Sequence, residues 1–226
     1  MSKRRNLKRE IKEKLNDDVL RDALGRFSEV YPAAREKALE NIEDVEALRE
    51  GLKSMKRDSV ERIEELADRF EEEATRRGVK VFRAKTGDDL KKYILDLCGE
   101  RGVKGIVKSK SMASEEVDLN PALEGAGIEV KETDLGEWII SLAGHKPSHM
   151  VLPAIHLNRY QVSEYFSREL DKSIEPDIPF MVQTARVALR EKFLSADMGI
   201  TGANFGIAEN GAIGLVTNEG NARLVT

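Results

Sequence analysis

After Gly78, short runs of β-branched residues alternate with capped helical stretches, and this alternation limits the fold more than any other feature of the sequence. Two segments have the composition of strands, namely Gly105-Ile106-Val107 and Ile128-Glu129-Val130. Thr86 and Asp89 form a capping box that begins a helix ahead of the first of these strands. Strands that alternate with helices are typical of βαβ units. The sequence therefore predicts an α/β fold with an open, mostly parallel sheet.

Turn and capping residues place the other elements of this region. Gly102 ends the first helix, Ser114 is expected to cap a helix that runs through Leu119 and Leu123, and Gly125 ends that one. Further helices are expected over residues 134–142, 156–170 and 179–194, and further strands over residues 79–82, 149–152, 212–217 and 222–226. The last two strands flank a turn at 218–221, so the chain would stop inside a strand, which favours a sequence cut from a longer one.

The first 77 residues differ from the rest of the chain in composition. They are nearly free of glycine and dense in charge, and their apolar residues recur at helical intervals, as in Ile42, Val45, Leu48, Leu52 and Met55. This narrow apolar stripe predicts amphipathic helices that pack over another body. We therefore expect a helical leader and docking arm over residues 1–77 and an α/β domain over residues 78–226.

Charge and cysteine content exclude several classes of function. The 37 Lys and Arg against 41 Asp and Glu give a net charge of -4, which disfavours nucleic acid as a partner. No apolar run approaches the roughly 18 residues of a membrane span, so we expect a cytoplasmic protein. Cys98 is the single cysteine, which excludes an internal disulfide and leaves too few thiolates for an iron–sulfur cluster within these residues.

Two segments carry candidate chemistry. Lys108-Ser109-Lys110-Ser111 follows an expected strand directly, where a doubly wound sheet presents ligand sites, although the same residues also suit a solvated loop. Glu209 lies between apolar Ile207-Ala208 and a turn in a glycine-rich run. A desolvated carboxylate there would serve as nucleophile, base or acceptor, and the alternative is a hairpin turn with the carboxylate in water.

The three histidines do not have the spacing of a metal site. His145 and His149 lie on either side of Pro147, His156 follows a second proline, and no HExxH pattern is present, so no metal is expected in this chain. His149 is expected either to orient a ligand at a strand edge or to satisfy a backbone carbonyl. Taken alone, the residues give no complete catalytic set.

Several ordered blocks together resemble the LUD domain, a family named for lactate utilisation. The blocks are Lys108-Ser109-Lys110-Ser111-Met112, Glu116, Asn120, Leu123-Glu124, Gly127-Ile128-Glu129-Val130, Thr133-Asp134-Leu135-Gly136-Glu137, Pro147-Ser148-His149-Met150-Val151, Pro153-Ala154, His156 and the run from Thr201 to Gly211. The likeness spans roughly residues 30–226. The helical leader further resembles the larger, LutB-type iron–sulfur member of the family.

The resemblance implies a fold similar to the NagB/RpiA/CoA-transferase group and a role with partner subunits in oxidising L-lactate to pyruvate. LutB-type members continue into a ferredoxin-like module that binds two [4Fe–4S] clusters, so this chain would be the amino-terminal domain and the clusters would lie outside it. Fold alone does not give function. A small carboxylate, CoA or a phosphate is the expected ligand class.

The same superfamily includes CoA-transferases with a nucleophilic glutamate in a Ser-Glu-Asn-Gly motif, which Ala208-Glu209-Asn210-Gly211 resembles with alanine in place of serine. This implies Glu209 as the candidate catalytic residue, and it leaves a stand-alone CoA-transferase-like or sugar-phosphate-isomerase-like enzyme as the alternative function. The residues expected to bind ligand are Lys108, Ser109, Lys110, Ser111, His149, Asn204, Asn210 and Gly211.

Overall fold

The computed structural model describes residues 7–149, 151–217 and 219–226, and the chain divides into two units. One unit comprises Met1–Glu50 and Ile139–Met181, and the other comprises Gly51–Trp138 and Val182–Thr226. The chain crosses from one unit to the other within α3 (Val45–Glu61), α8 (Leu135–Ala143) and α10 (Ile178–Ser195). The boundary at residue 78 that the sequence suggests stays a prediction.

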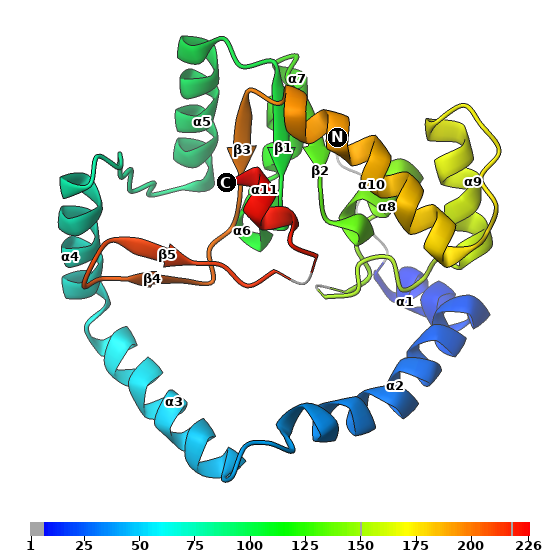
Figure 1. Cartoon of the computed structure of the whole chain (residues 1–226), viewed down its shortest axis with the longest axis horizontal. Coiled ribbons are helices and arrows are strands. Elements are labelled where there is room, and N and C mark those ends of the chain that lie inside the picture. Colours follow the sequence, from blue (N-terminus) through cyan, green and yellow to red (C-terminus); the bar gives the residue numbers. More distant parts are fainter. Residues whose placement is uncertain (1–6, 150, 218) are drawn as a thin grey trace. The chain divides into compact units, whose positions relative to one another are not determined.

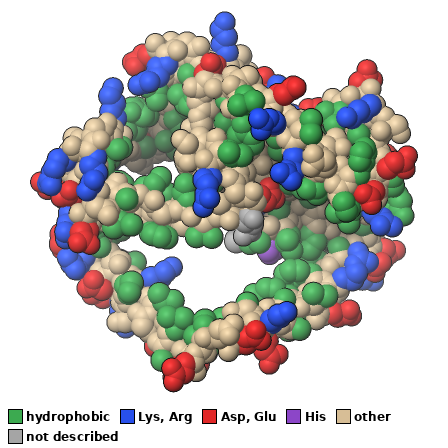
Figure 2. All heavy atoms as spheres, in the orientation of Figure 1, with side chains coloured by type: hydrophobic (Ala, Val, Ile, Leu, Met, Phe, Trp, Pro, Cys, Tyr) green, Lys and Arg blue, Asp and Glu red, His purple; other side chains and the backbone are tan. Residues whose placement is uncertain are grey.

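The glycine-poor leader is helical, as its periodicity predicts. It forms α1 (Leu7–Leu15), α2 (Asp18–Leu39), α3 and α4 (Ile63–Arg76). Asp17 begins α2 because its side chain accepts a hydrogen bond from the Leu20 N–H at 3.1 Å. On the face shown in Figure 2, basic and acidic side chains are interspersed, as the similar numbers of the two kinds lead one to expect.

A parallel sheet lies at the centre of the second unit (Figure 1). Its strand order is β2 (Glu129–Glu132), β1 (Gly105–Lys108), β3 (Met198–Ile200), and Ile106 of the middle strand pairs with Val130 on one side and Met198 on the other. The structure thus confirms the expected open parallel α/β fold preceded by helices. The strands β2 and β3 lie on opposite sides of β1, so the strand order reverses at β1. The carboxyl ends of β1 and β3 meet at this point.

Three helices connect and cover β1 and β2: α5 (Gly87–Arg101), α6 (Met112–Glu116) and α7 (Leu119–Gly125). The capping box of Thr86 and Asp89 is present, and Gly102 ends α5 in the left-handed conformation with φ of 64°. Apolar side chains from α5, α7, β1 and the adjoining loops form one buried cluster, namely Cys98, Val103, Ile106, Leu119, Leu123 and Ile128. This core fixes the sheet against α5 and α7.

A hairpin of β4 (Phe205–Ile207) and β5 (Ala212–Gly214) packs on α4 in the same unit. Gly206 lies against the Phe70 ring, and a Cβ at Gly211 would meet the backbone of Ala74. Gly211 also has φ of +67°. Glycine at this turn therefore allows both the left-handed backbone and the close approach to α4.

Three strands expected from the sequence do not form. Residues 79–82 have no partner in a ladder, and Phe82 instead stacks on Tyr93 at 4.2 Å between ring centroids. The described residues of 149–152 form a bend, and Met150 lies outside the described residues. Residues 222–226 fall largely in α11 (Asn221–Val225), where helical spacing buries Asn221 and Val225 on the same side.

Local capping shifts other boundaries. Ser111, and not Ser114, caps the helix after β1, since its Oγ accepts the Ser114 N–H at 3.3 Å. The helix expected from His156 begins at Arg159 as α9 (Arg159–Glu169), because Asn158 forms a capping box with Gln161. Among the described residues, no helix has the length and apolarity needed to cross a membrane.

Candidate functional site

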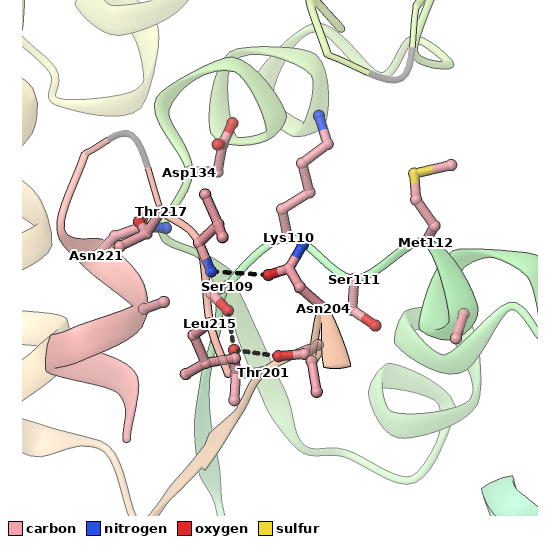
Figure 3. A pocket seen from close by; sticks show the side chains of 15 residues that line it. Ser109, Lys110, Ser111, Met112, Asp134, Thr201, Asn204, Leu215, Thr217 and Asn221 are labelled. Atoms are coloured by element: carbon pink, nitrogen blue, oxygen red, sulfur yellow. Dashed lines mark hydrogen bonds between the residues drawn. The ribbon is translucent and has the colours of Figure 1, made fainter. Parts of the chain in front are cut away.

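A cavity of about 360 Å³ opens at the carboxyl ends of β1 and β3 (Figure 3). Ser109 directly follows β1, Thr201 directly follows β3, and Asp134 lies two residues beyond β2. The remaining lining residues are Lys110, Ser111, Met112, Ala113, Gly202, Ala203, Asn204, Leu215, Val216, Thr217, Asn221 and Ala222. Ligands of open parallel sheets bind at such a crevice, so this cavity is the candidate site.

Hydrogen bonds hold the loop after β1 to the loop after β3. Ser109 Oγ and Thr201 Oγ1 are 2.6 Å apart, and Thr201 Oγ1 also donates to the Gly202 carbonyl at 3.0 Å. The Ser109 N–H donates to the Ile200 carbonyl at 2.9 Å. These contacts extend the β1 and β3 pairing beyond the sheet, so the floor of the cavity is preorganised.

A second set of hydrogen bonds runs along the opposite wall and reaches the residue that follows β2. Asn204 Oδ1 accepts the Val216 N–H at 2.7 Å, which ties the start of the hairpin to its end. Thr217 Oγ1 donates to Asn221 Oδ1 at 2.8 Å, and Asn221 Nδ2 donates to Thr133 Oγ1 at 3.2 Å. Hydroxyl and amide groups thus form part of the cavity lining, beside apolar side chains such as Met112 and Leu215, and they suit a ligand that carries hydroxyl or carboxylate oxygens.

Lys110 supplies the cation of the cavity lining. Its Nζ lies 3.1 Å from Glu137 Oε1, and the Glu137 side chain is 8% exposed. In Figure 3 the Lys110 side chain extends away from the hydrogen-bonded Ser109 and Thr201. Its ammonium is thus held at the edge of the cavity by a nearly buried carboxylate, and an anionic ligand would have to compete with that carboxylate for it.

Lys108 lies behind the cavity, in the interior. Its side chain is fully buried, and its Nζ contacts Glu132 Oε1 at 2.8 Å and Ser114 Oγ at 3.1 Å. Asn120 Nδ2 donates to the same Glu132 oxygen at 2.7 Å. Within the described part of the chain, Glu132 Oε2 and Asn120 Oδ1 are buried without a hydrogen-bond partner. Lys108 therefore forms a buried ion pair and does not line the cavity.

Glu115 of α6 belongs to the same charged region. Burial raises the pKa of its carboxyl, and the carboxylates of Glu137 and Glu132 raise it further, while Lys108 and Lys110 oppose this rise. The region thus contains a carboxyl that takes up a proton more readily than an ordinary glutamate.

The structure brings together four of the residues expected to bind ligand and separates the others. Ser109, Lys110, Ser111 and Asn204 line the cavity, whereas Lys108, Asn210 and Gly211 do not. Asn210 Oδ1 accepts the Ala212 N–H at 3.0 Å and shapes the turn between β4 and β5.

Glu209 is exposed at this turn and lies outside the cavity lining. This is the arrangement of the hairpin-turn alternative, and the catalytic role implied by the resemblance stays a prediction.

His149 belongs to the other unit. Its Nδ1 accepts hydrogen bonds from the N–H groups of Val151 and Leu152, at 3.1 and 3.2 Å. These contacts are with backbone N–H groups and not with a carbonyl, and the role of His149 in orienting a ligand stays a prediction. Over the described ranges, no three His, Cys, Asp or Glu side chains come together as a metal site requires.

Sequence patterns did not identify several of the residues that line the cavity. Thr201 had a usable signal, because it directly follows a strand within the glycine-rich run. Thr217 and Asn221 had none, since the segment that carries them was interpreted as a strand and a turn. Asp134 was interpreted as the start of a helix and as part of a family block. It fulfils the first role by accepting the Glu137 N–H at 3.1 Å.

Comparison with known proteins gives a consistent result. Residues 67–226 match the family model described as the LUD domain. Lactate utilization protein B of Macrococcus caseolyticus is 40% identical over 225 residues, which cover 97% of this chain and 46% of that protein. The proteins of the same name from Oceanobacillus iheyensis and Bacillus subtilis are 41% identical over 221 residues and 39% identical over 220 residues, with the same two coverages. The chain thus spans about half the length of these relatives, and no solved structure matches it.

Proposed function

This chain belongs to the LUD domain family, and from that premise we propose that it acts in L-lactate utilisation as a domain of a lactate utilization protein B. The observation that carries the proposal is the match to proteins of that name over 97% of the chain. The matched family region also contains every residue that lines the cavity. The proposal places this activity in the cytoplasm.

We further propose that the electrons of lactate oxidation pass through two [4Fe–4S] clusters held outside these residues. A [4Fe–4S] cluster takes four cysteine thiolates, and this chain offers one cysteine, Cys98, which is buried in the core. The domain would then bind a ligand and contact the other subunits of a lactate-oxidising complex. Its cavity would take a small hydroxylated carboxylate, with the hydroxyl and amide groups as hydrogen-bond partners.

The first test is the intact mass and the iron and acid-labile sulfide content of the native protein, purified without oxygen together with whatever subunits accompany it. A mass about twice 25.3 kDa with about eight iron atoms supports the proposal. A mass of 25.3 kDa without iron contradicts it. The alternative, a stand-alone enzyme that uses Glu209, would then be tested by whether Glu209→Gln abolishes turnover of thioesters or sugar phosphates.

The second test separates the family role from the cavity. The full-length protein is expressed in a host that lacks its own lactate utilization protein B, and growth on L-lactate is measured. Ala113→Leu fills the cavity without removing a side-chain hydrogen bond, and Ala126→Leu, at an exposed position outside the cavity in the same unit, is the control. We expect the wild type and Ala126→Leu to restore growth and Ala113→Leu to fail.

The two parts of the proposal fail in different ways. No growth with the wild-type protein would contradict the role in lactate utilisation. Full growth with Ala113→Leu would leave that role intact and rule out the cavity as the ligand site.

A further inference from the structure

The segment between α8 and α9 contains a hydrogen-bonded array of three side chains. His156 Nδ1 lies 2.6 Å from Ser148 Oγ, and His156 Nε2 lies 3.1 Å from His145 Nδ1. His156 is 9% exposed, whereas Ser148 and His145 are exposed. Both ring nitrogens of a buried imidazole are thus engaged by residues of its own segment.

The array can hold one extra proton but not two. A neutral imidazole has one donor and one acceptor nitrogen, so the contact between the two rings needs a proton on one of the facing nitrogens. With one added proton, His156 can donate to both Ser148 Oγ and His145 Nδ1. With a second, both facing nitrogens carry hydrogen and both rings carry charge, so the bond is lost and the rings repel each other.

Neighbouring charges come from three other elements. Burial, the adjacent His145 and Lys14 of α1 lower the pKa of His156, and Asp17 at the start of α2 opposes them. Asp17 is itself engaged, because its carboxylate accepts the Leu20 N–H and pairs with Lys14 Nζ at 3.2 Å.

On the other side, the Tyr165 ring of α9 meets the His145 ring edge-on, with 6.4 Å between centroids, and the Arg168 guanidinium lies over that tyrosine. Of all these surroundings, burial, His145 and Lys14 disfavour a positive charge on His156.

We propose that His145, Ser148 and His156 form a pH-sensitive clasp that holds residues 144–149 to residues 151–158 at neutral pH and releases them when acidification adds a second proton to the histidine pair. Among the described residues of the segment, the array is accompanied by a hydrogen bond from the Ser148 N–H to the Pro153 carbonyl, at 3.0 Å, and by local contacts of His149, Ile155 and Leu157. Opening exposes this turn while the flanking helices α8 and α9 stay formed.

The experiment is hydrogen exchange of the chain between pH 8 and pH 5, read by mass spectrometry and corrected for the intrinsic pH dependence of amide exchange. Peptides that cover residues 144–158 are expected to lose protection by about tenfold for each pH unit below the second protonation of the pair. Peptides from β1 and α5 serve as an internal reference and should not change. Constant protection of residues 144–158 over this range overturns the proposal.

Two matched variants identify the group that titrates. His145→Asn keeps a polar side chain beside His156 but cannot take a proton, so its exchange should no longer depend on pH. His149→Asn removes the other histidine of the segment while keeping a short acceptor for the Val151 and Leu152 N–H groups, and it should retain the wild-type dependence. A dependence that persists in His145→Asn, or that disappears in His149→Asn, contradicts the clasp.

A measurement on the unaltered chain tests the clasp even if a variant fails to fold. The ring signals of the histidines are followed by NMR over the same pH range. The clasp predicts that the two facing rings take up protons in two separate steps. A single step overturns it.

Discussion

Removing the buried ammonium of Lys108 should destabilise the protein far more than removing an equivalent exposed one. In Lys108→Met, Glu132 keeps the hydrogen bond from Asn120 but loses the charge that compensates its carboxylate, and its Oε2 already lacks a partner among the described residues. Leaving one member of a buried ion pair without its partner costs about 3 to 5 kcal/mol of unfolding free energy. Because the Lys108 side chain is fully buried, we expect the upper part of this range.

The assay is urea unfolding followed by the fluorescence of Trp138, the single tryptophan, which is 1% exposed and lies in the same unit. The matched control is Lys192→Met, which removes another lysine that pairs with a β2 glutamate. Its Nζ lies 2.6 Å from Glu129 Oε1, but both side chains are exposed, so the loss should stay below about 1 kcal/mol.

A double-mutant cycle separates the pair from the rest of the site. Lys108→Met combined with Glu132→Gln should cost less than the sum of the single changes, by about 1 to 3 kcal/mol, because the second change removes the stranded charge. If Lys108→Met costs no more than Lys192→Met, or if the two changes simply add, the ion pair is not what stabilises this region.

Two further predictions follow from the backbone and from burial. Gly211→Ala should lower the stability by about 1 to 2 kcal/mol, because φ is +67° there and the new Cβ would meet the backbone of Ala74. Gly99→Ala in α5 has open space around it and should raise the stability by up to about 1 kcal/mol. The thermal unfolding midpoints of the two variants should therefore shift in opposite directions. Burial and the nearby Glu137 raise the pKa of Glu115, so the folded state favours its protonated form, and the stability that this provides at low pH is lost as the pH rises through the raised pKa. Glu115→Gln should therefore become more stable than the wild type as the pH rises from 4 to 7 in urea unfolding, and a difference that does not vary with pH would refute the assignment.

Local signals account for the parts of the fold that were predicted correctly. The capping box at Thr86, the left-handed Gly102 and the β-branched residues before Lys108 act within a few residues, so their effects can be predicted from the sequence. The expected strand at residues 79–82 failed because a strand needs a neighbour to pair with, and no short segment specifies its neighbour. The same limit applies to residues 222–226, where the burial of Val225 favoured a helix.

The candidate site was also predicted in part from local signals. The position of Ser109 to Ser111 after a strand was enough to predict a place at the ligand edge of the sheet, and three of the four residues in Lys108 to Ser111 line the cavity. The sequence could not show that Lys108 lies in the interior, because β1 is the middle strand and successive residues on both of its faces are buried, which only the tertiary packing decides.

By itself, the sequence determined the fold class, the helical leader and the family, since periodicity, caps and ordered motifs are local or additive along the chain. Only the tertiary structure decided which residues share the cavity. Thr201 meets Ser109 across 92 positions of sequence, and Asn221 meets Thr133 across 88, because parallel strands and a returning chain end converge on one edge of the sheet. Contacts over such separations depend on how every intervening element packs, and no local pattern encodes them.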